Sequence, residues 1–154
     1  MSDIPRDQIA DAIEALLADV RWGPEGEERG WAQHGQRLII WTESAQPAFY
    51  LVEHDEVWAQ RTNMPYRVEL RYKIVVYQDS AADRSATGAR LNRTIQAAIE
   101  KALRPRPSDP GFHQERNTLG GLVHHMFIFG DLFKDGGDLD GQAVMVIPIS
   151  VLVP

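Results

Sequence analysis

The sequence TLGGLVHH (residues 118–125) opens an apolar hairpin whose second strand, residues 143–153, closes the sequence. A free strand edge offers unpaired N–H and C=O groups, and an apolar edge without charges promotes aggregation. We therefore expect this strand either to be paired inside its own sheet or to be covered by a neighbouring subunit. This alternative guides the functional interpretation.

Both arms of the hairpin are apolar on both faces. Such a pattern is typical of a strand covered on both sides, and one face of the closing strand is our candidate subunit interface. Pro148 cannot donate to a ladder, so it predicts an edge or a bulge. In the first arm, one face carries Val123, His125, Phe127 and Phe129 and the other carries Leu122, His124, Met126 and Ile128. In the closing strand, one face carries Met145, Ile147, Ile149 and Val151, the candidate interface, and the other carries Val144, Val146, Pro148 and Leu152.

Composition indicates an ordinary globular protein. The length fits one domain, residues 1–154, with a single core. Acidic residues outnumber basic ones by 22 to 16, and the net charge of -6 argues against a general affinity for nucleic acid. Cysteine is absent, which excludes disulfides, thiolate nucleophiles and cysteine-ligated zinc. No apolar run approaches the roughly 20 residues that cross a bilayer, so we expect a soluble cytoplasmic protein without a membrane partner.

Two segments have helical periodicity. Apolar residues predict an amphipathic helix over residues 4–20, with Asp3 as a cap and Pro5 in the first turn. A second apolar stripe predicts a helix from Leu91 to Leu103, before a proline-rich connection. Between residues 25 and 35 the chain is polar and glycine-rich, and we interpret it as a loop that carries one buried or interfacial aromatic residue, Trp31.

The remaining periodic segments predict strands. Residues 37–42 and 48–54 are β-prone runs separated by a turn. From Tyr66 a period of two predicts a strand with Val68, Leu70, Tyr72, Ile74 and Val76 on one face and Arg67, Glu69, Arg71 and Lys73 on the other. The order helix, strands, helix, two strands predicts an α+β fold, a mostly antiparallel sheet flanked by two main helices.

No pattern points to a catalytic residue, a cofactor or a metal. His124 and His125 are adjacent on a predicted strand and point to opposite faces, so they cannot bind one metal together. The acidic segment at 135–141 resembles a calcium loop, but the EF-hand register leaves Gly136 in the first position and Ile147 where a bidentate glutamate is needed. We interpret this segment as a solvated hairpin connection.

The connection over residues 131–141 is expected to project beyond the apolar arms. Its residues can be substituted without affecting the core. In an oligomer the same connection would be repeated, so weak contacts by each copy would add up to stronger binding through multivalency. Its carboxylates, Asp135, Asp138 and Asp140, form the candidate docking loop.

Six segments, in order, carry a resemblance: Val57-Trp58, Lys73-Ile74-Val75-Val76-Tyr77, Leu91-Asn92, Thr118-Leu119-Gly120-Gly121-Leu122-Val123-His124, Gly141-Gln142-Ala143-Val144 and Ile147-Pro148-Ile149. Together they resemble the tail-terminator (tail-completion) proteins of long-tailed bacteriophages, the family of the phage lambda terminator. The resemblance covers most of the chain after about Ala48 and rests on the order and spacing of the segments. Its hairpin motif residues are Thr118, Leu119, Gly120, Gly121, Gly141 and Gln142.

The resemblance implies a structural virion protein and not an enzyme. Proteins of this family assemble as a hexameric ring that caps the tail tube, stops its polymerisation and provides the head-joining surface. The implied partners are five further copies of the chain, the major tail tube protein and a head-completion or connector protein, while DNA only passes through the lumen. The implied location is the head–tail junction of the virion, after assembly in the host cytoplasm.

Two other classes remain as alternatives. One is a head–tail connector or baseplate adaptor of related fold, and the other is a small intracellular ligand-binding domain or enzyme. The genes beside this one would separate the virion classes from the third, because a tail terminator gene is expected between head-completion and major tail protein genes.

Overall fold

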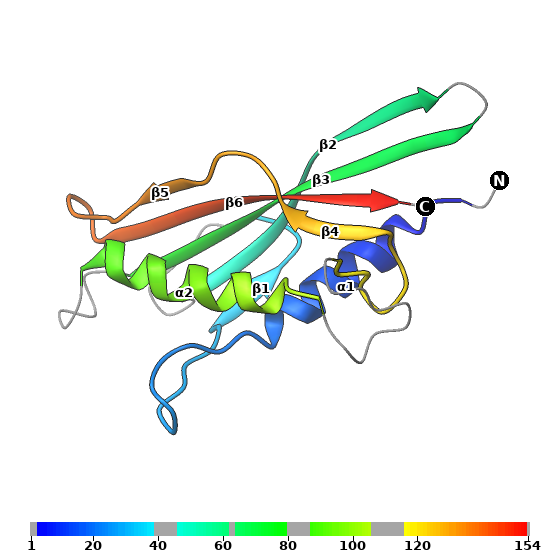
Figure 1. The fold of residues 1–154 in the computed structure, drawn as a ribbon. Coiled ribbons are helices and arrows are strands. Elements are labelled where there is room, and N and C mark those ends of the chain that lie inside the picture. Colours follow the sequence, from blue (N-terminus) through cyan, green and yellow to red (C-terminus); the bar gives the residue numbers. More distant parts are fainter. Residues whose placement is uncertain (1–2, 39–45, 62–63, 80–86, 106–115, 154) are drawn as a thin grey trace.

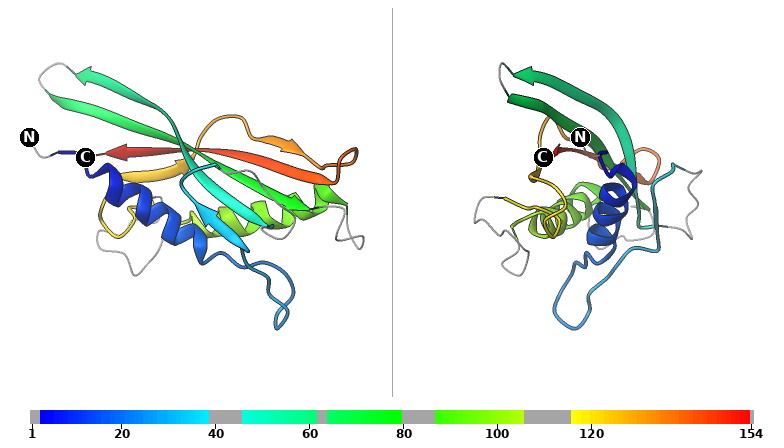
Figure 2. Two further views of the ribbon diagram at one scale, coloured as in Figure 1. Left: turned by 180° about the vertical axis from the view of Figure 1, so that it is seen from behind. Right: turned by 90° about the vertical axis from the view of Figure 1, so that its right-hand side faces the viewer.

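Both helices lie on the same face of one sheet (Figures 1 and 2). The computed structural model describes residues 3–38, 46–61, 64–79, 87–105 and 116–153. In these residues the sheet has six strands and is mostly antiparallel, which confirms the predicted α+β fold. The elements are α1 (Arg6–Ala18), β1 (Gln33–Gly35), β2 (Ala48–Arg61), β3 (Met64–Asp79), α2 (Gly88–Ala102), β4 (His125–Ile128), β5 (Phe133–Asp135) and β6 (Gln142–Val153).

The sheet is built around the long strands β2, β3 and β6. Their order is β1-β2-β3-β6, and β6 carries both β4 and β5 on its other edge. β2 and β3 pair over most of their length, with a register shift between Glu53 and Asp55. β6 ends opposite Val68, and beyond the Trp58–Val68 pair β2 and β3 extend past it (Figure 1). We call residues 57–61 and 64–69 the β2–β3 arm.

Pro148 divides the outer edge strand into β4 and β5. Phe129 donates its backbone N–H to the Pro148 carbonyl at 3.1 Å. In an antiparallel pair the N–H and C=O of one residue face the same neighbour, so the donor that Pro148 lacks would face this edge strand. The chain leaves the ladder at Gly130, whose φ is +120°. The expected edge or bulge at Pro148 is not found, because β6 pairs with β3 without a register shift there; the missing donor instead coincides with a break in the neighbouring edge strand.

The helices cover the face of the sheet that carries the core. Alternate residues of β3 are buried from Val68 to Val76, while Arg67 is exposed and Lys73 is half-buried on the other face, as the period of two predicts. One cluster of buried apolar side chains joins α1, α2 and strands β2, β3, β4 and β6.

The predicted subunit interface lies on the buried face of β6, so this prediction is wrong. Met145, Ile147 and Val151 are 0% exposed and Ile149 is 1% exposed, because they pack inside the subunit's own core beneath the helices. They cannot contact a neighbouring subunit. Only the opposite face of β6 remains partly accessible.

The first helix and the first strand differ from their predicted positions. α1 begins at Arg6, with Pro5 as its N-cap; the Ile9 N–H reaches the Pro5 carbonyl at 2.9 Å, and no side chain caps the helix, so Asp3 does not. β1 lies at Gln33–Gly35, before the predicted run at 37–42, because it pairs in parallel with the start of β2. Residues 37 and 38 are outside any strand, and residues 39–42 lie outside the described part of the chain.

Trp31 is partly buried and packs against the core. Its indole Nε1 donates to the Leu17 carbonyl at 2.8 Å. Its ring meets Trp22 and Phe49 edge-on, with ring centroids 4.7 and 4.9 Å away. The loop before β1 is thus attached to α1 and to the sheet. Neither described helix has the length and apolar character needed to span a membrane.

Candidate functional site

The face of the sheet opposite the helices, which we call the open face, bears a strip of apolar residues. In the described part of the chain no helix lies on this face (Figure 2). The even-numbered residues of β6 point to it because the odd-numbered ones are in the core. Those that are apolar are all half-buried: Val144, Val146, Pro148 and Leu152.

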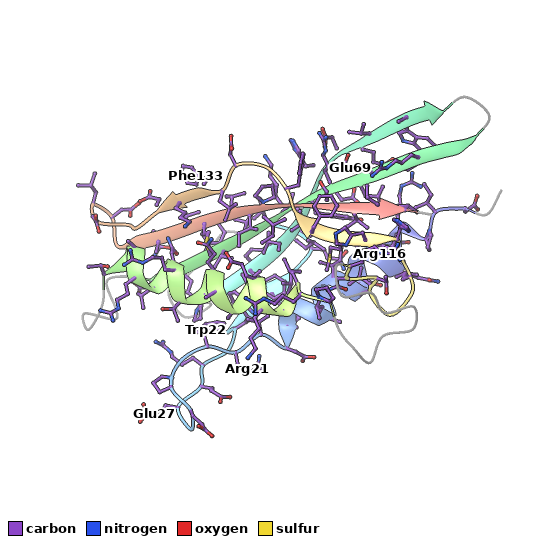
Figure 3. The ribbon with its side chains drawn as sticks, in the orientation of Figure 1. Arg21, Trp22, Glu27, Glu69, Arg116 and Phe133 are labelled. Atoms are coloured by element: carbon purple, nitrogen blue, oxygen red, sulfur yellow. The ribbon has the colours of Figure 1, made fainter. Side chains whose placement is uncertain are left out.

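An aromatic ladder borders this strip along the outer edge. We define it as His125, Phe127, Phe129 and Phe133. His125 stacks on Phe127 with ring centroids 4.7 Å apart, and Phe127 meets Phe129 edge-on at 6.0 Å. Phe129 and Phe133 are 58% and 57% exposed, on either side of the break at Pro148. Phe133 pairs with Val146, which places its side chain on the open face (Figure 3).

A second exposed aromatic residue, Trp58, lies at the base of the β2–β3 arm. Trp58 is 54% exposed, and its Nε1 donates to Glu56 Oε2 at 3.2 Å. Glu56 in turn accepts from Arg6 Nε at 2.6 Å and from Arg6 Nη2 at 3.0 Å. The hydrogen bond from Arg6 holds the pKa of the Glu56 carboxyl below its usual value of 4.5. A residue of α1 thereby orients an exposed indole on β2.

The candidate docking loop contains a strand and a tight turn. β5 lies inside the expected connection, so the projecting turn is only residues 136–141. Asp135 Oδ1 accepts from the Gly137 N–H, and Asp140 Oδ1 accepts from the Gln142 N–H, both at 2.9 Å. Asp135, Asp138 and Asp140 are exposed. Between the last two, Leu139 is fully exposed at the tip.

The predicted hairpin motif is divided between the two ends of the sheet. Thr118 to Gly121 form a turn in which Thr118 Oγ1 accepts from the Gly121 N–H at 3.1 Å. Asn117 fastens this turn to the end of α2 by donating to the Leu103 carbonyl at 3.1 Å. Gly141 and Gln142 lie at the other end, where Gln46 Nε2 donates to Gln142 Oε1 at 3.0 Å. The structure therefore does not bring the motif residues together into one site.

A buried amide network, which sequence reasoning missed, joins α2 to the turn before β6. Asn92 is 1% exposed, and its Nδ2 donates to the carbonyls of Asp135 at 3.1 Å and Val144 at 3.4 Å. Its Oδ1 accepts from Gln78 Nε2 at 3.0 Å. A polar residue on an otherwise apolar helix face was the only signal in the sequence.

Three of the described histidines, His34, His124 and His125, contact protein partners. His34 stacks on Phe49 at 5.3 Å, with its Nδ1 2.7 Å from Glu14 Oε2. His125 Nδ1 accepts from the Asn117 N–H at 3.3 Å, and burial, with the positive charge of Arg116, lowers the His125 pKa below 6.5. In the described residues no three His, Asp or Glu side chains gather in a way that could hold a metal. His113 lies outside this part.

A hollow of about 540 Å³ between the loop at Trp22 and α2 offers little reactive chemistry. Its polar lining includes Gln46, Gln78, Asp79 and Thr94. Elsewhere, burial raises the pKa of Tyr72 to about 12, so this phenol stays protonated at neutral pH. These groups supply hydrogen bonds and packing without a paired nucleophile and base.

No protein-family model and no curated protein matches the chain. The aromatic ladder, Trp58 and the tip at Leu139 are exposed features of the described surface. All three are surfaces suited to contacts between proteins, because exposed aromatic and apolar side chains in fixed positions are typical of interfaces.

Proposed function

We propose that this protein is a structural subunit of a bacteriophage tail, a hexameric ring that caps the tail tube, ends its polymerisation and provides the head-joining surface. The observation that carries the proposal is the one-sided sheet. Both helices cover one face, while the open face has half-buried apolar residues bordered by Phe129 and Phe133, which are more than half exposed. Apolar surface of this extent favours a subunit that is completed by others.

The order of segments that resembles the tail terminators supports this proposal over an enzyme. Two distinct exposed patches, one at Trp58 and one on the ladder, favour heterologous contacts, which close into rings when the rotation permits. In this reading the turn at 136–141 is repeated around the rim. Its partners are the major tail tube protein and a head-completion or connector protein, and DNA only passes through the lumen.

The experiment is to express the tail genes encoded near this chain with and without it. Without the chain we expect tubes of uncontrolled length by electron microscopy, and with it tails of uniform length capped at one end. Labelled protein at the end opposite the baseplate supports a terminator, whereas label at the baseplate indicates the adaptor alternative. A folded protein that binds no tail and leaves tube length unchanged would contradict the proposal.

A further inference from the structure

Basic side chains lie where α2 ends and β4 begins. Lys101 and Arg104 are exposed at the C-terminal end of α2, and Arg116 lies beside the start of β4 (Figure 3). Asn117 joins the two segments, because its Nδ2 donates to the Leu103 carbonyl at 3.1 Å and to the Arg104 carbonyl at 3.3 Å. Residues that are distant in the sequence thereby place their positive charges at one end of the molecule.

The guanidinium of Arg116 is stacked on an imidazole ring. Its Nη1 lies 3.2 Å from Nδ1 and 3.1 Å from Nε2 of His124. The two ring nitrogens point in different directions within the ring plane, and an atom in that plane so close to both would clash with the carbon between them. Nη1 therefore lies over the face of the ring, a contact typical of the planar arginine cation. The stack holds the guanidinium in position and leaves its remaining N–H donors available.

No carboxylate of the described residues neutralises this group of cations. Arg6 and Arg71 form ion pairs with carboxylates of the sheet. Within the described part of the chain, Arg116, Arg104 and Lys101 form none. The chain as a whole carries a net charge of -6, so this positive end is a local feature. An arginine that is held in place with free donors is suited to bind an oxyanion.

His125 responds to the positive potential at this end. Burial lowers its pKa below 6.5, and the charges of Arg116 and His124 lower it further. Its ring is fixed between the Phe127 ring, with centroids 4.7 Å apart, and the Asn117 N–H. An anion bound at Arg116 would offset the positive charges, so the His125 pKa is a readout of binding.

We propose that Arg116, positioned by the His124 ring and with Arg104 nearby, binds a phosphate group. The guanidinium fork matches two phosphate oxygens, and the tetrahedral group has further oxygens for a second cation, whereas a carboxylate has only two oxygens in all. Free phosphate and the backbone of a nucleic acid offer the same chemistry to this site. The inference goes beyond the proposed function and depends neither on ring formation nor on tail capping.

Titration with inorganic phosphate, followed by NMR of the histidine rings, tests the site. At constant pH and ionic strength the ring signals of His124 and His125 should move and saturate, and the His125 pKa should rise. His34, which contacts Glu14 of α1, should not respond. Acetate in place of phosphate is the control, and an equal response to acetate would overturn a phosphate site.

Variants with matched charge locate the site. Arg116→Gln should weaken phosphate binding about tenfold or more, because it removes charge-assisted hydrogen bonds. Arg93→Gln, which removes the same charge from an exposed position of α2, should leave binding unchanged. His124→Phe keeps a ring beneath the guanidinium and should bind phosphate more tightly than His124→Ala. Thermal unfolding of each variant checks that the fold is intact. Equal binding by Arg116→Gln and Arg93→Gln would overturn the site.

A short DNA duplex distinguishes the two sources of phosphate. If the same ring signals respond to the duplex, and both rising salt and Arg116→Gln abolish the response, the ligand is a nucleic-acid backbone. A response to inorganic phosphate alone identifies a free anion. Rings that respond to neither probe would overturn the site and leave the proposed function unaffected.

Discussion

Arg6 at the start of α1 holds the Glu56 carboxylate of β2 through two hydrogen bonds, of 2.6 and 3.0 Å. Because Glu56 also accepts from Trp58, this pair ties the first helix to the base of the β2–β3 arm. Helix and arm are 50 residues apart in the sequence. The contact therefore fixes the position of the exposed indole relative to the body of the protein.

Arg6→Ala should cost stability in a manner that depends on pH. The depressed pKa of Glu56 means that its contribution is present above its ordinary value of 4.5 and is lost as the pH falls through the folded-state value. Both side chains are partly exposed, so we expect a loss of about 0.5–1 kcal/mol at pH 7. Urea unfolding at pH 7 and at pH 3 should show the difference shrinking in acid, while Arg93→Ala on α2 serves as the control. An undiminished difference at pH 3 would contradict the ion pair.

Asn92→Ala should destabilise the fold strongly. The substitution leaves the buried amide of Gln78 and the carbonyl of Asp135 without the partners they have in the native protein. Unsatisfied buried polar groups cost about 1–3 kcal/mol. Thermal unfolding measures the loss, and Arg93→Ala, one residue along the same helix, should have almost none. Equal stability of the two variants would show that the network contributes nothing.

Gly137→Ala and Gly120→Ala form a matched pair. Both glycines have a positive φ, +71° and +72°. A Cβ on Gly137 would lie 2.3 Å from the Gln142 carbonyl carbon, whereas one on Gly120 would meet no atom within 4 Å. The left-handed backbone alone costs about 1–2 kcal/mol per alanine, so Gly137→Ala should exceed Gly120→Ala in its effect on the free energy of unfolding. Equal effects would mean that the turn before β6 relaxes freely.

The turn tip should dock without contributing to the fold. Replacing Asp135, Asp138 and Asp140 with lysine would remove two turn acceptors, so the sharper variant is Asp135→Asn, Asp138→Lys and Asp140→Asn, in which both Oδ1 acceptors remain. We expect normal melting and normal self-association but impaired tail capping or head joining by electron microscopy. Normal virion yield would exclude this turn from the docking surface.

His125 should make stability depend on pH near neutrality. Its ring accepts a hydrogen bond from Asn117 and must be neutral at Nδ1 to do so. Because burial and Arg116 lower its pKa in the folded state, its stabilisation is complete above about 6.5 and is lost as the pH falls toward the folded-state value. His125→Phe, which can keep the stack on Phe127, should flatten this part of the profile in urea unfolding. An unchanged profile would assign the acid sensitivity to another group.

Much of the fold was readable from local pattern. The period of two from Val68 to Val76 predicts β3 and its buried face, and helical spacing predicts α2, because both patterns follow from backbone geometry. Pro148 indicated an irregular position in the sheet, although the irregularity is a break in the neighbouring strand and not an edge or a bulge of β6 itself.

Local sequence pattern does not decide which of two apolar faces is buried, or which of two neighbouring segments forms a strand. β6 is apolar on both faces, and only the docking of the two helices put Met145 and Ile149 inside the subunit and left Val146 and Pro148 on the open face. β1 formed at Gln33–Gly35 because a partner strand was available there.

Composition and spacing along the chain are enough to predict the two helices, the long strands, the α+β class and the lack of cysteine chemistry. The candidate surfaces depend on how distant segments pack together. Arg6 contacts Glu56, which lies 50 residues further along the chain. The aromatic ladder continues from β4 to β5 past a break in the edge strand. Neither arrangement produces a periodic pattern in the sequence. Contacts between distant segments depend on how the layers pack, which local spacing does not encode.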